Sequence, residues 1–91
     1  MKHVLVSSKN PALVDALREA SESGTVFLSE EGLDETLDRI GRSARVDAVV
    51  TDDLEVLSAI RREIPGAIPV HLVSAGEAPA TTWTRISALL D

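Results

Sequence analysis

The sequence predicts an α/β fold: a three-layer sandwich in which a four-stranded parallel sheet lies between two layers of helices. Short apolar segments alternate along the chain with longer segments in which apolar residues recur at helical spacing. Residues 46–51 lack the polar–apolar alternation of a half-exposed strand, and this is typical of a strand that is buried on both faces. These two observations together favour a parallel sheet that is covered on both sides.

The first strand and the first helix follow from the opening of the chain. Residues 4–6 are an apolar run that predicts a strand. Asn10 and Pro11 come next, and these residue types prefer the N-cap and the first position of a helix. Apolar residues then recur at helical spacing, which predicts a helix over 11–22, and we expect Gly24 to be its C-cap.

The second strand and helix are predicted in the same way. Residues 25–29 form a short strand segment that is bounded by glycine and polar residues. In the segment after it, Leu33, Leu37 and Ile40 lie on one helical stripe. Glutamates stand near the start of this segment and arginines near its end, which is the arrangement that the helix dipole favours.

The second half of the chain repeats this alternation twice. Residues 46–51 predict the third strand, and a helical stripe over 54–64 predicts the third helix, which Pro and Gly at 65–66 end. Residues 68–73 predict the fourth strand, and apolar residues over 83–90 predict a last helix.

The order of the strands follows from this alternation, because parallel crossovers are right-handed. With the first strand in the centre, the predicted order is 2-1-3-4, with the first helix on one face and the second and third helices on the other. One helix cannot cover a face of four strands, so we expect the last helix to return to the face of the first. There Trp83, Ile86 and Leu90 would pack on the first and third strands.

Size and charge limit the class of protein. The 91 residues suffice for one domain, 1–91, with a modest core, since small chains bury a smaller share of their surface. Nine basic residues against fifteen acidic ones give a net charge of −6. Binding to a phosphate backbone needs a basic surface, so this balance argues against nucleic acid as a partner.

Cysteine content and hydropathy bear on the compartment. The chain has no cysteine, which excludes disulfides and thiol chemistry and fits a reducing environment. No apolar run is long enough to span a membrane, and the opening residues turn polar too soon for a signal peptide. We therefore expect a cytoplasmic protein without a membrane partner.

Four stretches carry a resemblance to a known family. Residues 2–20 are similar to its opening strand, polar turn, proline and first helix, residues 29–40 to its second helix, 46–75 to its third and fourth strands with the helix between, and 83–91 to its final helix. The chain thus resembles the receiver domains of two-component response regulators, which are flavodoxin-like. The resemblance covers most of the chain and implies a truncated, degenerate receiver-like domain over 1–91.

The family's phosphorylation site is only partly present. In a working receiver, acidic residues after the first strand hold Mg²⁺, an Asp ending the third strand accepts a phosphoryl group, a Ser or Thr ends the fourth strand, and a Lys ends the fifth. Aligning Pro11 with the family's proline puts Ser8 and Lys9 at the acidic positions, Asp52 at the phosphoacceptor and Ser74 at the Ser/Thr position. The loop after the acceptor, the fourth helix, the fifth strand and its Lys have no counterpart.

Several roles are open to Asp52. Lys9 would bring a positive charge to the place of the metal, and an ion pair of Lys9 with Asp52 would then replace it. Two unit charges about 4 Å apart attract by about 4 kcal/mol at intermediate dielectric, before desolvation is subtracted. Alternatively, Asp52 caps the next helix with Glu55 as its capping-box partner, or Asp53 serves as the cap instead. A pocket that binds a ligand or anion, and phosphorylation of Asp52, are the remaining roles.

The loss of the acidic pair favours a non-catalytic function. We expect a pseudo-receiver that acts as a protein–protein interaction module in signalling or scaffolding, and not an enzyme. Its relic pocket would consist of Asp52, Asp53, Ser8, Lys9 and Ser74, without a metal or cofactor. The alternatives are a receiver that is phosphorylated on Asp52, and a small-ligand site at the carboxyl ends of the strands.

The fourth strand is a candidate interface. Without a fifth strand, residues 68–73 form an outer strand whose apolar edge is unpaired, and Pro69 blunts this edge only partly. We expect protein partners, including a homodimer, to bind through this strand or the last helix, with Val70, His71 and Trp83 at the interface. His3 and His71 have no cysteine or clustered acid nearby in the sequence, so strand positions explain them better than metal binding.

Overall fold

The computed structural model describes the whole chain except residues 22–23, 43–44, 65, 67 and 91. Strands and helices alternate along it in the predicted order. They are β1 (Lys2–Ser7), α1 (Pro11–Ala20), β2 (Thr25–Glu30), α2 (Leu33–Arg42), β3 (Ala48–Thr51), α3 (Leu54–Glu63), β4 (Val70–Leu72) and α4 (Pro79–Leu90). Within the described part of the chain, no helix is both long enough and apolar enough to cross a bilayer.

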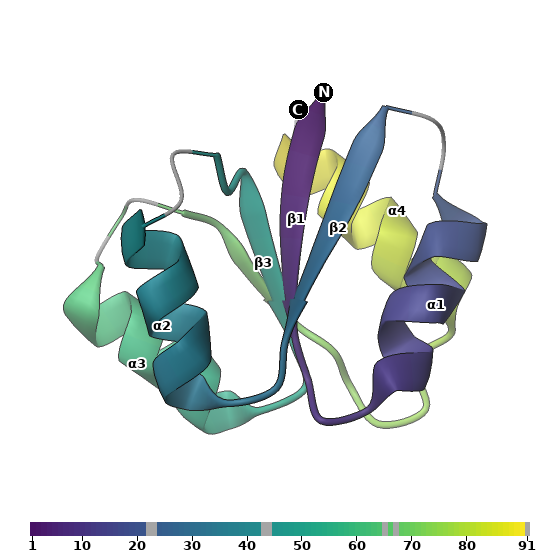
Figure 1. Cartoon of the computed structure of the whole chain (residues 1–91). Helices are drawn as coiled ribbons and strands as arrows, with labels where there is room; N and C mark the ends of the chain where they lie inside the picture. The colour runs from purple at the N-terminus through teal and green to yellow at the C-terminus, as the bar shows by residue number, and fades with distance from the viewer. Residues whose placement is uncertain (22–23, 43–44, 65, 67, 91) are drawn as a thin grey trace.

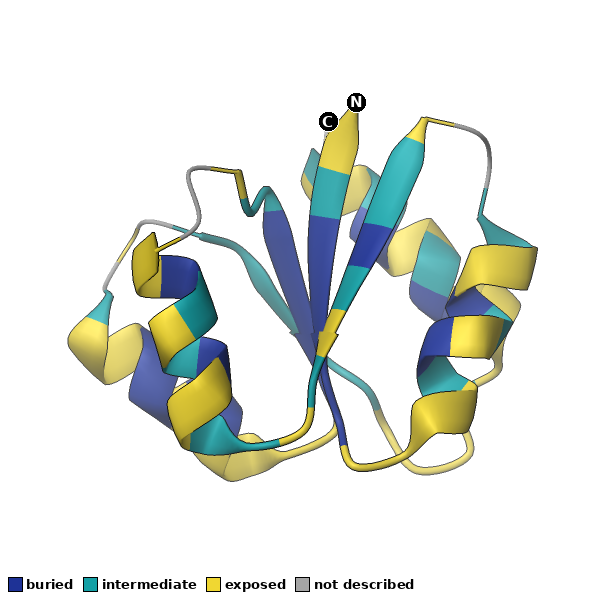
Figure 2. Cartoon of the chain, in the orientation of Figure 1, coloured by how far each residue is buried: buried dark blue, intermediate teal, exposed yellow. Residues whose placement is uncertain are grey.

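The strands form one parallel sheet in the order β2-β1-β3-β4 (Figure 1). This confirms the predicted fold class and strand order. All four residues of β3 are buried, as the sequence of this strand indicated, and the second half of β1 is buried beside it (Figure 2). Since the strands run in parallel, their carboxyl ends meet at one edge of the sheet.

Two layers of helices cover the sheet. Helices α1 and α4 lie on one face and α2 and α3 on the other, as Figure 1 shows. On the first face, Leu17 and Ile86 are fully buried against the strands, so the last helix returns to the face of the first as predicted. On the second face, Leu5 and Val49 pack against Ile60 of α3. The core is aliphatic apart from Phe27, whose ring meets Trp83 edge-on with centroids 6.1 Å apart.

The end of α1 differs from the sequence expectation. Gly24 is not the C-cap of α1, because the helix ends at Ala20 and the Ser21 amide donates to the Leu17 carbonyl at 2.9 Å. Gly24 instead adopts a positive φ of 97° just before β2, a conformation that glycine adopts at little cost. Residue 22, at the predicted end of this helix, lies outside the described residues.

The second half of the chain shows further differences at its boundaries. β3 begins at Ala48, and β4 is shortened to Val70–Leu72. Ile64 is the C-cap of α3, and Pro65, which we expected to end this helix, lies outside the described residues. α4 begins at Pro79, earlier than its apolar stripe indicated, because its first turn consists of Pro and small residues that carry no apolar signal.

Candidate functional site

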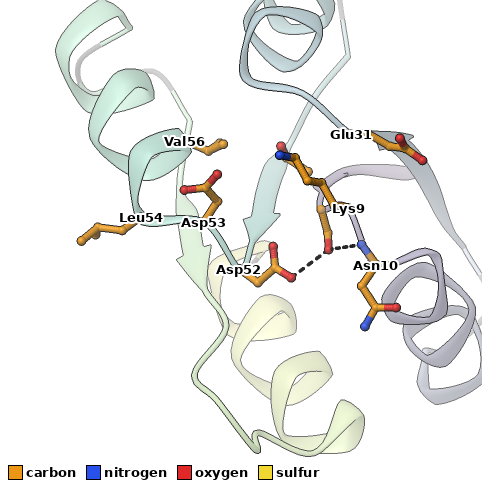
Figure 3. Close-up of a pocket in the computed structure, with 9 residues that line it drawn as sticks. Lys9, Asn10, Glu31, Asp52, Asp53, Leu54 and Val56 are labelled. Atoms are coloured by element: carbon orange, nitrogen blue, oxygen red, sulfur yellow. Dashed lines mark hydrogen bonds between the residues drawn. The ribbon is translucent and has the colours of Figure 1, made fainter.

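An open pocket lies at the carboxyl ends of β1 and β3, where the predicted phosphorylation site would be (Figure 3). Its volume is about 480 Å³. Parallel strands bring their terminal loops together here, which is the usual place for a ligand site in open α/β sheets. The pocket is lined by Ser7, Ser8, Lys9, Asn10, Glu31, Asp52, Asp53, Leu54 and Val56.

Asp52 follows β3 directly, and its carboxylate is held by the loop after β1. Its Oδ2 accepts a hydrogen bond of 2.8 Å from the Ser8 hydroxyl. The same Ser8 oxygen accepts a hydrogen bond of 3.0 Å from the Asn10 amide (Figure 3). Ser8 is nearly buried, so this relay from Asn10 through Ser8 to Asp52 fixes one carboxylate oxygen against the loop. At this position Ser8 donates a hydrogen bond to Asp52. A working receiver would have a carboxylate here, and that carboxylate would bind the same metal ion as the phosphoacceptor.

Asp53, and not Asp52, caps α3. Its Oδ1 accepts a hydrogen bond of 2.9 Å from the Glu55 amide, and its carbonyl accepts one from the Val56 amide. The Asp53 amide in turn donates to the Thr51 hydroxyl at 3.1 Å, which turns the chain from strand into helix. Of the alternatives left open by the sequence, the structure thus assigns the cap to Asp53 and leaves Asp52 free for the pocket.

Lys9 lies in the pocket without the predicted ion pair. None of the ion pairs among the described residues involves Lys9. In Figure 3 its side chain extends away from the Asp52 carboxylate. The expected Lys9–Asp52 pair is therefore wrong for this structure, because Ser8 already satisfies the near oxygen of Asp52 and both charged groups are exposed to water. Lys9 still contributes a positive charge where a receiver carries a negative one.

Ser7, which lines the pocket, is hydrogen-bonded to a second buried hydroxyl, that of Thr36. Thr36 of α2 is fully buried and donates to the Gly32 carbonyl at 2.7 Å. Since the Thr36 proton is used there, the Ser7 hydroxyl is the donor in its 2.6 Å hydrogen bond to the Thr36 oxygen. This chain of hydrogen bonds ties the end of β1 to α2. Ser7 is thus a structural group and not a free nucleophile.

Ser74 lies outside the pocket. It is exposed in the loop after β4, where its carbonyl accepts a hydrogen bond of 3.0 Å from the Glu77 amide. This turn directs the chain toward α4 and away from Asp52. Of the five residues that we predicted for the relic pocket, Asp52, Asp53, Ser8 and Lys9 line it and Ser74 does not.

A buried cluster near β4 was missed at the level of sequence. The Glu77 side chain is only 5% exposed, and its Oε2 accepts a hydrogen bond from the Thr82 hydroxyl and lies 2.8 Å from His71 Nε2. Burial raises the pKa of Glu77, but the hydrogen bonds from Thr82, His71 and the Ser74 amide outweigh this and hold the pKa below its ordinary value. Glu77 stands among small, loop-forming residues, so no periodicity indicated its burial.

The predicted interface residues are distributed over two regions. Val70 and His71 lie in β4, at the outer edge of the sheet, and both are half-buried. Trp83 is partly buried and packs against the core on the face of α1 and α4, where its ring contacts Phe27. His3 lies in the central strand, where its amide donates to the Asp47 carboxylate at 2.7 Å and lowers the pKa of that group.

The chemistry of the pocket is polar and mainly acidic. Glu31, Asp52 and Asp53 contribute three carboxylates against the single ammonium group of Lys9. No group of three His, Cys, Asp or Glu side chains in the described part of the chain could hold a metal ion. The arrangement can bind water or a positively charged group.

Comparisons with known proteins give no relative. A scan against protein-family models and searches of curated proteins and of solved structures found no match to this chain. The parallel sheet of order β2-β1-β3-β4 between two helical layers is consistent with a flavodoxin-like three-layer fold. The function must therefore be argued from the residues of the site and from the surface of the sheet.

Proposed function

We propose that this chain is a receiver-like domain that does not carry out phosphoryl transfer and works by binding other proteins. The observation that carries the proposal is the environment of Asp52. This residue keeps the position of a phosphoacceptor after β3, but its nearest polar partner is the hydroxyl of Ser8. Asp52 thus stands where a receiver has its phosphoacceptor, but the acidic pair that would bind Mg²⁺ beside it is absent from positions 8 and 9.

The chemistry of acyl-phosphate formation supports this proposal. Mg²⁺ prefers octahedral oxygen ligands, with one or two carboxylates, and it neutralises charge on the transferring group. At the positions of the acidic pair, Ser8 offers a neutral oxygen that already donates to Asp52, and Lys9 offers a positive charge. Lys9 puts a positive charge at one of the two positions that would hold the metal, so the ligand set disfavours Mg²⁺ although the pocket as a whole is acidic.

A domain without chemistry of its own acts through its surface. The edge of β4 supports such a role, because it is an outer strand of the sheet and presents unpaired backbone groups. Strand addition to an exposed edge is a recurrent way in which proteins bind one another. We therefore place the interaction surface at β4, with Val70 and His71 as its side chains.

Magnesium binding tests the proposal at the site itself. We expect NMR titration of the wild-type chain with Mg²⁺ to give no saturable shift of the amides of Ser8, Lys9 and Asp52. The double variant Ser8→Asp, Lys9→Asp restores the acidic pair and is expected to gain a saturable shift at the same amides. Adding Asp52→Asn to this variant removes the third carboxylate and should weaken the gain. Saturable binding of Mg²⁺ to the wild-type pocket contradicts the proposal.

A further inference from the structure

The two outer strands of the sheet differ in how their free edges are covered. The carbonyls of Gly24, just before β2, and of Glu30, at its end, accept hydrogen bonds from the amides of Lys2 and Ser8. Backbone groups alternate in direction along a strand, so the odd-numbered residues between them, including Phe27, direct their amides and carbonyls away from β1. The outward carbonyl of Phe27 accepts a hydrogen bond of 3.4 Å from the guanidinium group of Arg18 in α1. A charged side chain thus covers the middle of this edge, which is one of the ways in which proteins prevent strand addition.

No comparable contact from the described residues covers the edge of β4. The Pro69 carbonyl and the Val73 amide are bonded to β3, so the backbone groups of Val70 and Leu72 point away from the sheet. Among the residues that the structure describes, no side chain forms a hydrogen bond with these outward amides and carbonyls. The sheet therefore has one covered edge and one open edge.

We propose that the open edge of β4 pairs with β4 of a second copy of this chain, antiparallel and about a two-fold axis at His71. The inference rests on the proposed function as an interaction module and names its partner. In this register Val70 lies opposite the partner's Leu72, and each such pair exchanges two backbone hydrogen bonds. All the outward amides and carbonyls of Val70 and Leu72 in both copies are then satisfied. The dimer has one continuous sheet with the β2 edges at its ends.

The distribution of charge favours a second copy at this edge. The chain carries a net charge of −6, so two copies repel one another over most of their surface. α4, which packs on β3 near the edge, contains no acidic residue, and Arg85 is its single charged side chain. α3 packs against β4 on the other face, and its charged residues, Glu55, Arg61, Arg62 and Glu63, sum to zero. The two helices beside β4 therefore add no net negative charge next to this edge, which limits the repulsion between two copies.

Glu77 is the acidic residue nearest in sequence to β4, and its side chain is buried beside the strand. The Glu77 side chain is only 5% exposed and is hydrogen-bonded to His71 and Thr82, so its carboxylate is withdrawn from the surface of this edge. His71 belongs to β4 and lies at the proposed axis, on the face of α4. The strand at the open edge thus carries no acidic side chain, and its outer residues Val70 and Leu72 are apolar, which favours pairing with an identical edge.

Sedimentation velocity over a range of protein concentrations, together with disulfide trapping, tests the inference. The wild-type chain is expected to shift from monomer to dimer as its concentration rises. The chain has no cysteine of its own, so Val70→Cys and Leu72→Cys each introduce a single thiol. In the proposed register residue 70 of one copy faces residue 72 of the other, with Cα atoms about 5.5 Å apart. This separation lies within the range of about 4.4–6.8 Å that a disulfide requires.

The register makes a specific prediction for mixtures. An equimolar mixture of the two variants should form a disulfide-linked dimer, whereas each variant alone should form much less. Identical positions would be about 8–9 Å apart, given the spacing between and along paired strands. A chain that stays monomeric at every concentration overturns the inference and leaves β4 open to a strand of another protein. Equal crosslinking in the mixture and in the single variants also overturns it. Neither result bears on Asp52, so the proposed lack of phosphoryl transfer is tested separately.

Discussion

Asp52 and Asp53 are neighbours in the chain, but their partners differ. Asp53 holds the Glu55 amide and begins α3, whereas Asp52 accepts a hydrogen bond from Ser8 across the sheet. The sequence left open which of the two caps the next helix; the structure assigns the cap to Asp53, and both residues line the pocket. The sequence could not predict the partner of Asp52, because Lys9 and Ser8 are adjacent and the turn geometry decides which of them reaches the carboxylate.

Glu77 gives a prediction on pH at the scale of one residue. Its pKa is below the ordinary value of 4.5, so the ionised form contributes stability that is present above that pH and is lost as the pH falls through the lower, folded-state pKa. Replacing it with glutamine removes the charge, and we expect a loss of about 1–2 kcal/mol of unfolding free energy near neutral pH. Urea unfolding at several pH values measures this difference. It should shrink below pH 4.5, and a difference that grows in acid would contradict the account.

At the scale of the elements, most of the fold could be predicted because each strand and helix has its own local signal. Asn10 and Pro11 begin α1 as expected, and the Asn10 side chain accepts from the Ala12 amide. Right-handed crossovers then leave few possible strand orders, and the order 2-1-3-4 that we predicted is the one observed. The ends of elements were less predictable, because tertiary contacts decide them: β4 keeps only three residues where an apolar run of six had been expected to be strand.

The start of α3 allows a test of the assigned cap. Asp53→Ala leaves the Glu55 amide without its side-chain partner, and losing an N-cap costs about 1 kcal/mol of stability. Chemical denaturation followed by circular dichroism measures the change. Asp53→Ser keeps a capping oxygen and should stay close to the wild type, while Asp52→Asn keeps the acceptor for Ser8 and should also change little. If Asp52→Asn is the more destabilising of the carboxyl variants, the assignment of the cap is wrong.

At the scale of the whole molecule, the two outer strands of the sheet, β2 and β4, differ in how their free edges are covered. Arg18 covers the β2 edge, whereas no side chain in the described part of the chain is hydrogen-bonded to the outward edge of β4, which lies beside a helix without acidic residues. The sequence predicted β4 as an outer strand, but it could not show that β2 is covered, since that depends on where the Arg18 side chain ends. Nor could it show that Ser74 lies outside the pocket, since the loop after β4 turns toward α4.

We propose that Asp52 does not accept a phosphoryl group. The most direct test of this proposal is the intact mass of the protein after incubation with acetyl phosphate and Mg²⁺. We expect an unchanged mass, because the Asp52 carboxylate accepts a hydrogen bond from Ser8, and because Ser8 and Lys9 stand where a receiver has the acidic pair that binds the metal. A mass gain of one phosphoryl group that Asp52→Asn abolishes would contradict it.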